Sequence, residues 1–492
     1  MRNHADVPSP SSLTRRQFIQ RCGSTAAIGA AAATVTRPRS ARAAKAPGEP
    51  VVLGLIGCGR RGTQLLEAAL SQPGIAFSVV CDVDALRAAA AVEASTRITG
   101  NRPAATGDYR DVLDDPQVEG VLIATPDHWH MIPFLAACAA GKDIYIEAPV
   151  AQFTNEAAAM KYAARKYKRV VQVGTQYRSA RSLTEAGGIV RSGQLGRIPQ
   201  VRTWTFAQQA PIARQPDGDP PPSLDYDRWL GPAPQQPYDP VRVQYPQHFW
   251  DYGGGEAMTW GFHLQDLMTA AMRVTVPRSI VAVGGNYGLD DFRETPDTLD
   301  ATFEYDLPWG KFMHVYSVRL SNAYAGWGPA AVPPAGHEDL DDPTPVPTRS
   351  GMQVFGSEHT LYVGGQRLLM LPAGVESPIE DLKYLGIGDE PLEPATRPAP
   401  AASRVDPLTA VHVRQFADCI RSKKEPSATI EMAEVALFPC VAAGIAYRVG
   451  RKLYIQPESR QFFTDPVFKT PDDEANKLLY RLYRPPYTPP NV

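Results

Sequence analysis

Cysteine is scarce in this chain: the 492 residues include six cysteines, and no two of them form a C-x-x-C pair. This argues against a disulfide-stabilised scaffold and against a cysteine-rich zinc site. The nearest approach to a metal pattern is the D-H-W-H segment, whose His128 and His130 would point in opposite directions on a strand, so we expect no metal centre. Most cysteines stand in apolar runs, and we expect buried thiols at Cys58, Cys81, Cys138, Cys419 and Cys440.

A strong net charge is also absent, because 50 basic residues nearly balance 52 acidic ones without long runs of either sign. Surfaces that bind nucleic acid need concentrated positive charge, so we expect no nucleic-acid partner. Outside the N-terminal segment, no hydrophobic run approaches the length of a transmembrane helix, and we expect no stable membrane insertion.

The N-terminus carries an export pattern. Arg15 and Arg16 form a twin-arginine pair ahead of a weakly apolar run of small residues at 23–35, and an A-x-A cleavage signal follows at 41–43. The run is too short and too rich in alanine to span a bilayer. We therefore predict a twin-arginine signal peptide at 1–43, transport by the twin-arginine translocase, and a periplasmic or otherwise exported mature protein. Removing the peptide leaves 43 basic and 51 acidic residues, a net charge of −8.

The most informative motif follows the signal peptide. A continuous apolar run at 51–56 turns into a G-x-G-x-x-G loop at Gly57, Gly59 and Gly62, and the pattern at 63–70 predicts an amphipathic helix. In a dinucleotide-binding fold, the first glycine permits the tight turn, the second lets the backbone approach a pyrophosphate, and the third lets helix and strand pack closely. The helix N-terminus then offers unpaired N–H groups to the phosphates.

Asp82 indicates which dinucleotide is bound. It ends a second apolar run, at 77–81, about twenty residues after the last glycine, where such a fold places the acid that binds the ribose hydroxyls. A carboxylate there repels a 2′-phosphate, so we predict NAD as the cofactor, with NADP less favoured. Arg60 and Arg61 work against that preference, since either side chain is able to meet a phosphate.

The order of strand and helix patterns predicts an α/β fold in two domains. Strands and helices alternate over 50–175, which is typical of a parallel, doubly wound Rossmann sheet. Strands without intervening helices dominate 176–455 and predict a C-terminal α+β domain with a large, mostly antiparallel open sheet, followed by late helices at 407–421 and 430–450. A Pro- and Tyr-rich C-terminal extension at 456–492 is expected to wrap the surface.

Pro- and Gly-rich connections interrupt the second domain. The stretches at 211–222 and 328–347 predict surface loops or lids, and a low-complexity stretch spans 393–402. The R-E-T-P-D run at 293–297 opens a strand and forms either a loop over the pocket or an Asx-capped turn.

Side chains at the carboxyl ends of parallel strands line the ligand cleft of such a fold. In this sequence the residues expected there are Thr125, Pro126, His128, His130 and Glu147.

The chain resembles the Gfo/Idh/MocA oxidoreductase family over nearly all of its mature length. The matching stretches are GLIGCGRRG, TPDHWH, GKDIYIEAP, VVQVGTQYRS, GGGEAMTWGFHLQD and DCIRSKKEPSATIE, and the end, DDEANKLLYRLYRPPY, is similar to the long extension of exported bacterial members. The resemblance implies NAD(P), sugar or polyol substrates, and homo-oligomers formed through the outer face of the C-terminal sheet. It also adds Pro149 and Gln176 to the cofactor residues.

The sequence departs from the family at two catalytic positions. The usual E-K-P motif, whose lysine assists proton transfer beside the nicotinamide, is matched by Glu147, Ala148 and Pro149. Alanine neither donates nor accepts a proton. The usual D-x-G-x-H motif is matched by T-W-G-F-H, so His263 is kept while Thr259 replaces the carboxylate.

His263 and Tyr177 are the expected catalytic residues. The Thr259 hydroxyl is predicted to orient His263 from one helical turn away, although a buried structural histidine is the alternative. Tyr177 would need a lowered pKa to act as a base, which neighbouring Arg178 would provide; alternatively Tyr177 packs and Arg178 binds sugar hydroxyls. The expected substrate residues are Arg178, Trp260 and His263. Glu256, Asp266 and His248 flank the site, and sequence spacing does not choose among them.

These features predict an exported NAD-dependent enzyme that acts on a sugar, polyol or glycoside with a tightly bound, recycled cofactor. One alternative is transient oxidation of a sugar carbon that permits elimination or hydrolysis of a glycosidic bond without net redox change. Another is a non-catalytic carbohydrate-binding or scaffold protein that keeps the fold, which Ala148 and Thr259 favour.

Overall fold

The computed structural model describes residues 49–216, 218–323, 349–364, 367–374 and 405–490. Three predicted features lie outside the described residues: the signal peptide at 1–43, the loop at 328–347 and the low-complexity stretch at 393–402.

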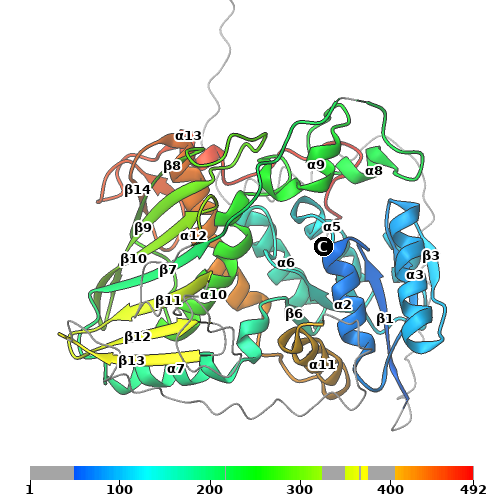
Figure 1. Cartoon of the computed structure of the whole chain (residues 1–492), viewed down its shortest axis with the longest axis horizontal. Coiled ribbons are helices and arrows are strands. Elements are labelled where there is room, and N and C mark those ends of the chain that lie inside the picture. Colours follow the sequence, from blue (N-terminus) through cyan, green and yellow to red (C-terminus); the bar gives the residue numbers. More distant parts are fainter. Residues whose placement is uncertain (1–48, 217, 324–348, 365–366, 375–404, 491–492) are drawn as a thin grey trace, which may run out of the picture. The chain divides into compact units, whose positions relative to one another are not determined.

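A six-stranded parallel sheet forms the N-terminal domain, in the order β3-β2-β1-β4-β5-β6 (Figure 1). The chain starts in the middle at β1, builds outward to β3, and then returns to pair β4 with β1. This reversal of strand order confirms the predicted doubly wound Rossmann sheet. The strands are β1 (Val51–Ile56), β2 (Ile75–Cys81), β3 (Ala104–Thr106), β4 (Gly120–Ile123), β5 (Asp143–Ile146) and β6 (Val171–Val173).

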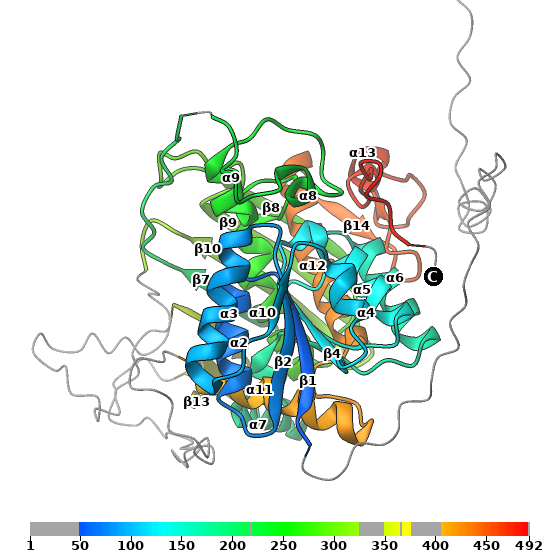
Figure 2. The same ribbon diagram turned by 90° about the vertical axis from the view of Figure 1, so that its right-hand side faces the viewer.

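Helices cover both faces of the parallel sheet, as Figure 2 shows, with α2 and α3 on one side and α4, α5 and α6 on the other. Buried strands need this cover because both of their faces are apolar. The helices are α2 (Arg60–Leu70), α3 (Ala85–Thr99), α4 (Tyr109–Asp114), α5 (Met131–Ala139) and α6 (Thr154–Lys166).

A nine-stranded sheet dominates the rest of the described chain, in the order β13-β12-β11-β7-β10-β9-β8-β14-β15. The pair β7 and β10 is parallel, and the other pairs are antiparallel, which confirms the predicted mixed but mostly antiparallel sheet. The strands are β7 (Gln200–Phe206), β8 (Ser279–Gly285), β9 (Thr298–Leu307), β10 (Gly310–Arg319), β11 (Ser350–Phe355), β12 (His359–Gly364), β13 (Arg367–Pro372), β14 (Leu453–Ile455) and β15 (Phe462–Phe463).

Three helices pack beside this sheet: α7 (Arg181–Ser192), α10 (Thr259–Met272) and α12 (Ile430–Val449). Helix α12 has the length and hydropathy of a membrane span, but 78% of its apolar window is buried inside the protein. It packs against α6, α10 and β8, so its apolar character on all sides is explained by a position in the core.

Two parts of the chain cross the predicted domain boundaries. Helix α11 (Pro407–Ser422) was assigned to the C-terminal domain by sequence, yet its Val413, Phe416 and Ile420 share a core with the Rossmann helices α2 and α3. Strand β15 lies in the predicted extension but pairs with β14 at the edge of the large sheet. Helix α11 meets its partners through contacts distant in sequence, which local patterns do not encode, whereas β15 pairs with the strand just before it.

Residues between β7 and α10 form an insert that lies against the Rossmann domain. Its short helices are α8 (Tyr226–Leu230), α9 (Pro240–Gln244), η3 (Pro246–His248) and η4 (Gly255–Ala257). The insert has a small aromatic core of its own, centred on Trp229, Phe249 and Tyr252. Backbone hydrogen bonds join it to the segment after β2, from Ala85 to Ser223 and from Asp225 to Val83.

Candidate active site

The glycine loop after β1 has the geometry of a phosphate cradle. Gly57 has φ +93°, and a Cβ there would lie 2.7 Å from the backbone of Ala124. A Cβ on Gly62 would lie 1.9 Å from the carbonyl oxygen of Gly57, so this position admits only glycine. A Cβ on Gly59, by contrast, would meet only the tip of Arg87, at 3.9 Å. The turn therefore needs glycine at positions 57 and 62 for packing, while the space beside Gly59 is open. This arrangement fits a dinucleotide pyrophosphate above the start of α2.

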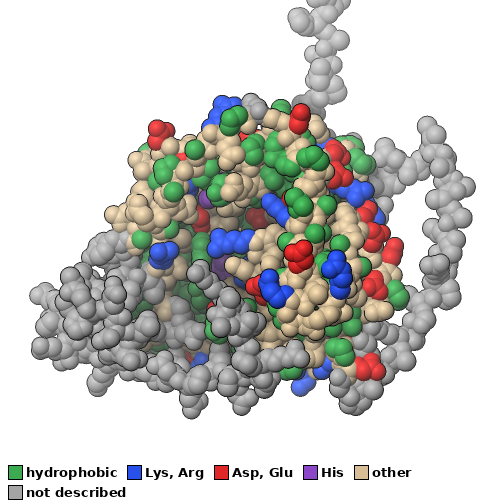
Figure 3. Space-filling model, turned by 45° about the vertical axis from the view of Figure 1, so that its right-hand side comes forward, with side chains coloured by type: hydrophobic (Ala, Val, Ile, Leu, Met, Phe, Trp, Pro, Cys, Tyr) green, Lys and Arg blue, Asp and Glu red, His purple; other side chains and the backbone are tan. Residues whose placement is uncertain are grey.

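The cradle opens into a cavity of about 940 Å³. Figure 3 shows a hollowed area near the middle of one face, with basic side chains around it. The cavity is lined by residues of the Rossmann domain, the insert and the start of α10. Its basic lining residues are Arg60, Arg61, Arg87, Arg110 and Arg228.

Asp82 stands at the wall of this cavity, directly after β2. Its Oδ2 accepts a hydrogen bond from the backbone N–H of Cys58 at 2.7 Å, and its Oδ1 accepts from Asp84 N–H at 2.8 Å. These bonds tie the carboxylate to the glycine loop, where a ribose would lie. Burial raises the pKa of Asp82, and the two backbone N–H groups oppose that shift.

Glu147 and Arg61 form an ion pair in the cavity wall. The Arg61 Nε lies 3.0 Å from the Glu147 Oε1, and the Glu147 Oε2 accepts from the backbone N–H of Ala148. A Cβ on Gly174 would lie 2.8 Å from Glu147, so the carboxylate fills the space above that glycine. Arg61, considered in the sequence as a phosphate ligand, is therefore already paired, and its partner Glu147 is next to Ala148.

The two histidine side chains of the T-P-D-H-W-H segment lie in different surroundings. Residues 127–129 form the 3₁₀ helix η1 rather than a strand. His130 lines the cavity, and its ring nitrogens lie 2.9 Å from the carbonyls of Thr125 and Pro149. His128 turns into the insert, where its Nε2 lies 3.0 Å from the Trp229 carbonyl. Burial lowers the pKa of His128 to about 3 and that of His130 to about 4.

Other predicted cofactor residues divide in the same way. Thr125 and Pro126 line the cavity, whereas His128, Pro149 and Gln176 are not among its lining residues. Gln176 lies in the 3₁₀ helix η2 (Gln176–Ser179), one residue before Tyr177. The expectation that His128 lines the cleft is not met because the aromatic core of the insert takes up its ring.

The predicted catalytic pair lies behind the cavity wall. The rings of His263 and Tyr177 pack edge to face, 6.4 Å apart, and neither residue is among the cavity lining. Burial and the charge of Arg61 lower the pKa of His263 to about 4. Burial raises the pKa of Tyr177, which is the opposite of what a base at that position requires.

Two interactions that the sequence predicted for Tyr177 and His263 are not found among the described residues. Arg178 was expected to lower the pKa of Tyr177 or to bind sugar; instead its guanidinium holds the buried Asp266 through bonds of 2.7 to 2.9 Å. Thr259 was expected to orient His263; its hydroxyl donates to the Glu256 Oε2 at 2.8 Å. In both cases a carboxylate nearby in space is a stronger acceptor than the partner inferred from sequence.

The cavity lining also includes Glu256, Trp260 and Tyr487, which the sequence predicted to different degrees. Trp260 was predicted as a substrate residue, and it lines the cavity with 43% of its surface exposed. Glu256 was only one of three flanking candidates, and its spacing of three residues from Thr259 was the available signal. Tyr487 comes from the C-terminal extension, and no local pattern indicated that it would reach the cavity.

Comparison with known proteins agrees with this arrangement. Residues 51–175 match the family model described as "Oxidoreductase family, NAD-binding Rossmann fold", and residues 201–273 match "Oxidoreductase family, C-terminal alpha/beta domain". The N-terminal domain is therefore an NAD-binding Rossmann domain, as predicted.

Curated relatives are similar over part of their length. Levoglucosan dehydrogenase of Pseudarthrobacter phenanthrenivorans is 36% identical over 114 residues, which is 22% of this chain and 29% of that protein. Glycosyl hydrolase family 109 protein 2 of Shewanella sp. (strain ANA-3) is 33% identical over 162 residues, 30% of this chain and 36% of that protein. The chain thus spans about a third of the length of these relatives.

Solved structures share the fold across most of the chain. Levoglucosan dehydrogenase in complex with NADH and levoglucosan has a TM-score of 0.58 at 19% identity, covering 82% of this chain and 99% of that one. The WlbA dehydrogenase of Bordetella pertussis, in complex with NADH and UDP-GlcNAcA, has a TM-score of 0.55 at 18% identity, covering 83% and 99%. Both matched models are those of the Gfo/Idh/MocA oxidoreductases, so residues 51–175 and 201–273 carry the two domains of that family.

Proposed function

We propose that this protein is an exported NAD-dependent oxidoreductase that acts on a hydroxyl group of a sugar, polyol or glycoside and keeps its cofactor bound. One observation carries the proposal: a single cavity joins the glycine cradle and Asp82 to Ala148, Glu256 and Trp260. A dinucleotide seated on the cradle and a small substrate beside Trp260 would share this space.

The residues of the cavity have separable tasks in this proposal. The cradle N–H groups would hold the pyrophosphate, and Asp82 would accept from the ribose hydroxyls. The half-exposed Trp260 ring offers a flat apolar surface to the C–H face of a sugar. When bound, NAD supplies a hydride acceptor. The name of one matched relative, levoglucosan dehydrogenase, supports a small polyhydroxylated substrate.

Retention of the cofactor follows from the proposed location. A protein exported through the twin-arginine route leaves the cytoplasm folded, and no pool of free NAD is available to it afterwards. Its cofactor would have to be regenerated on the protein, by a second substrate or by a reaction that oxidises and later reduces the same molecule.

That second route gives an alternative function, cleavage of a glycosidic bond without net redox change. Transient oxidation of a sugar carbon acidifies the neighbouring C–H bond and permits elimination. The similarity to a glycosyl hydrolase family 109 protein and the alanine at position 148 favour this alternative over a simple dehydrogenase. A carbohydrate-binding protein that keeps the fold is the non-enzymatic alternative.

One experiment separates the three functions. The purified protein is denatured, its released nucleotide is identified by chromatography, and the native protein is tested with a panel of sugars and glycosides for cofactor reduction and for bond cleavage. We expect bound NAD, and reduction or cleavage with at least one substrate.

The role of Asp82 is tested by measuring nucleotide binding. Asp82→Ala should weaken the binding of NAD much more than that of NADP, whereas Asp114→Ala, at an exposed carboxylate of α4, should change the binding of neither. Absence of any dinucleotide, with no binding on titration, would contradict the cofactor assignment. Bound NAD without any reaction would favour the binding protein.

A further inference from the structure

The two catalytic groups that the family pattern loses, a lysine and an aspartate, leave open which side chain carries the substrate proton. Two glutamates line the cavity, Glu147 and Glu256. Glu147 is held in an ion pair by Arg61, so its charge is already neutralised. No ion pair among the described residues joins Glu256 to a cation, and its side chain lies at the substrate end of the cavity with Thr259 and Trp260.

The carboxyl group of Glu256 is oriented by neutral donors. Its Oε2 accepts from the Thr259 hydroxyl at 2.8 Å, and its Oε1 accepts from the Gln209 Nε2 at 3.4 Å. The residue as a whole is 7% exposed, although it borders the cavity. Such a group is fixed in direction without being neutralised, and it can both accept and release a proton.

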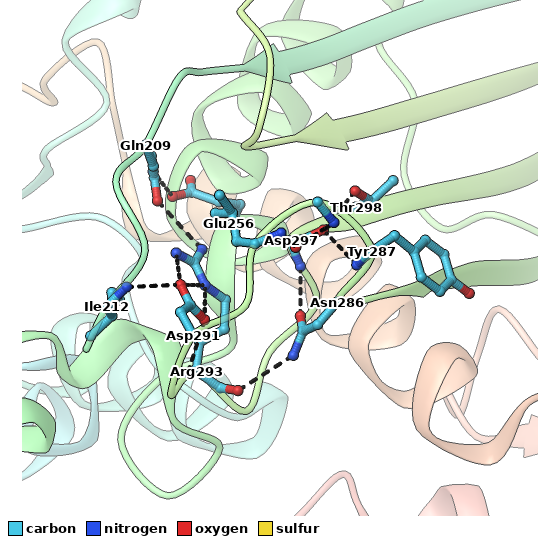
Figure 4. Close-up of polar contacts among 11 residues, drawn as sticks. Gln209, Ile212, Glu256, Asn286, Tyr287, Asp291, Arg293, Asp297 and Thr298 are labelled. Carbon is cyan, nitrogen blue, oxygen red and sulfur yellow. Dashed lines mark hydrogen bonds and ion pairs between the residues drawn. The ribbon is translucent and has the colours of Figure 1, made fainter. Parts of the chain in front are cut away.

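A buried ion pair stands behind Glu256 (Figure 4). The Arg293 guanidinium binds Asp291 through contacts of 2.6 to 2.9 Å, and both side chains are fully buried. Gln209 lies between this pair and Glu256, since its Oε1 accepts from Arg293 and its Nε2 donates to Glu256. Asp291 balances the arginine charge, so the pair supports Gln209 without supplying a full counter-charge to Glu256.

The backbone around Glu256 is also held in place. Gly255 has φ +63°, and a Cβ there would lie 2.6 Å from the Thr295 side chain, so only glycine allows this approach. The Tyr316 hydroxyl donates to the Glu256 carbonyl at 2.8 Å. The Asp297 carboxylate accepts from the backbone N–H groups of Tyr287, Gly288 and Leu289 and closes the loop that carries Arg293.

We propose that Glu256 is the acid–base residue of the substrate site, in the place of the missing lysine and aspartate. NAD held by the glycine cradle and Asp82 would supply the acceptor for the hydride that leaves the C–H bond of the reacting carbon. As the C=O bond forms, a Glu256 carboxylate oxygen would take the O–H proton, and in the reverse direction the Glu256 carboxyl would return it to the oxygen. Burial raises the pKa of Glu256, which brings the proton exchange closer to neutral pH than for an exposed glutamate.

The inference rests on the proposed function, and its test begins with Glu256→Gln in the full chain with its bound nucleotide. The amide keeps the size and most hydrogen bonds but cannot take the proton. We expect unchanged NAD content, sugar affinity within a few fold of wild type, and a fall in kcat of about 10²-fold or more. The acidic limb of the pH–rate profile should disappear. Glu185→Gln, at a partly exposed carboxylate of α7 outside the cavity lining, serves as the matched control.

Thr259→Val supplies a graded variant. It removes a hydrogen bond that favours the charged carboxylate, so the acidic limb should move to higher pH while most of kcat is kept. A merely structural role of Glu256 would lower stability or nucleotide content and would not move this limb. The assignment is overturned if Glu256→Gln keeps both the rate and the limb, or if the limb is lost in His263→Ala or Tyr177→Phe instead.

A readout without turnover keeps the two proposals distinguishable. Infrared difference spectra of the NAD-loaded protein, recorded across pH, should contain a carboxyl that titrates above the usual glutamate range and is missing in Glu256→Gln. Absence of that signal overturns the role of Glu256 even in an active protein. Absence of bound nucleotide or of any sugar reaction in the wild type counts against the proposed function while the carboxyl signal is still measurable.

Discussion

Ala148 stands where the resemblance to the family predicts a lysine, and its surroundings already hold a positive charge. The neighbouring Glu147 is bonded to Arg61, Tyr145 and the backbone N–H of Ala148. A positive charge is therefore already present beside the alanine, although a guanidinium of raised pKa does not exchange protons. Position 148 shapes the cavity, while proton transfer is proposed at Glu256.

A lysine placed at position 148, as the family pattern would have it, should consequently not raise the activity. We expect Ala148→Lys to be neutral or harmful for the native reaction, because its ammonium would compete with Arg61 for Glu147 and crowd the cavity. Steady-state kinetics on the native substrate would measure this, and Ala148→Met separates added volume from added charge. If Ala148→Lys, alone or with Thr259→Asp, turns an inert protein into a sugar dehydrogenase, the wild type is a decayed enzyme and the binding function is favoured.

Asp127 links the cavity to the pH dependence of stability. Its Oδ2 is buried without a hydrogen-bond partner among the described residues, and burial raises its pKa from 3.8 to about 7. A carboxyl with a raised pKa stabilises the fold while it is protonated, so that contribution is complete below about pH 4 and is lost as the pH rises through about 7.

Asp127→Asn should therefore raise the melting temperature at pH 8 by a few degrees and leave it nearly unchanged at pH 4, because the amide cannot ionise. Thermal unfolding at the two pH values measures the difference. Asp114→Asn, at an exposed position of α4, controls for the loss of one surface charge. An equal shift at both pH values would show that ionisation of Asp127 is not the cause.

At the scale of elements, the loop between β8 and β9 is held by buried charge in addition to the apolar packing of Leu289 and Phe292. The side chains of Arg293 and Asp291 are both fully buried, and Asp291 also accepts from the backbone N–H of Ile212 in the insert. The pair thus connects the loop of the large sheet to the insert over the cofactor cavity. Removing one partner leaves the other charge buried and unpaired.

Asp291→Asn should lower the free energy of unfolding by about 3–5 kcal/mol, the usual effect of breaking a buried ion pair. Denaturant unfolding, read by fluorescence, measures it. Asp306→Asn breaks the exposed pair with Lys311 and should change stability by about 0.5 kcal/mol or less. A similar small effect for Asp291→Asn would mean that the buried pair does not hold the loop.

At the scale of the whole molecule, residues 481–487 of the C-terminal extension, here called the strap, connect the insert to the Rossmann domain. Arg481 donates to the His128 carbonyl and lies 3.7 Å from Glu156 of α6. Arg484 and Tyr487 both bond to Asp227 of α8, at 2.6 and 2.7 Å. Since Tyr487 also lines the cavity, the strap closes the wall beside the predicted cofactor.

Loosening the strap should release the cofactor faster. The double variant Arg484→Ala, Tyr487→Phe loses both bonds to the Asp227 carboxylate and the other bonds of Arg484, to the carbonyls of Gly231 and Asp227 and to Gln235. We therefore expect an increase in the NAD dissociation rate of about tenfold or more. The rate is measured by trapping released NAD, and Arg181→Ala, in an exposed pair of α7, is the control. An unchanged dissociation rate with intact stability would exclude the strap from cofactor retention.

Export is the second property of the whole chain that awaits a test. Replacing Arg15 and Arg16 with lysine should leave unprocessed precursor in the cytoplasm, because the translocase reads this pair as an address. Cell fractionation and detection of the precursor and mature forms would show it. Normal export of the double variant would contradict the signal assignment.

Oligomer formation through the large sheet, which leaves Val283 and Met313 exposed, is likewise still a prediction.

Local patterns in the sequence were sufficient for the parts of this protein that depend on neighbouring residues. The glycine loop, Asp82 after β2, the alternating Rossmann elements and the buried cysteines were all predicted and are found. These features follow from backbone sterics and from hydrophobic periodicity, which act over a few residues.

The partners of polar side chains were decided only by the tertiary structure. Arg178 binds Asp266, 88 residues away, and of the two residues within one helical turn of Thr259 the folded chain pairs it with Glu256 rather than with His263. The placement of Tyr487 at the cavity depends on a strap that ends more than 300 residues after the Rossmann strands it approaches. Hydrogen bonds and ion pairs form with whatever acceptor the folded chain brings within about 3 Å, and sequence spacing does not encode that distance.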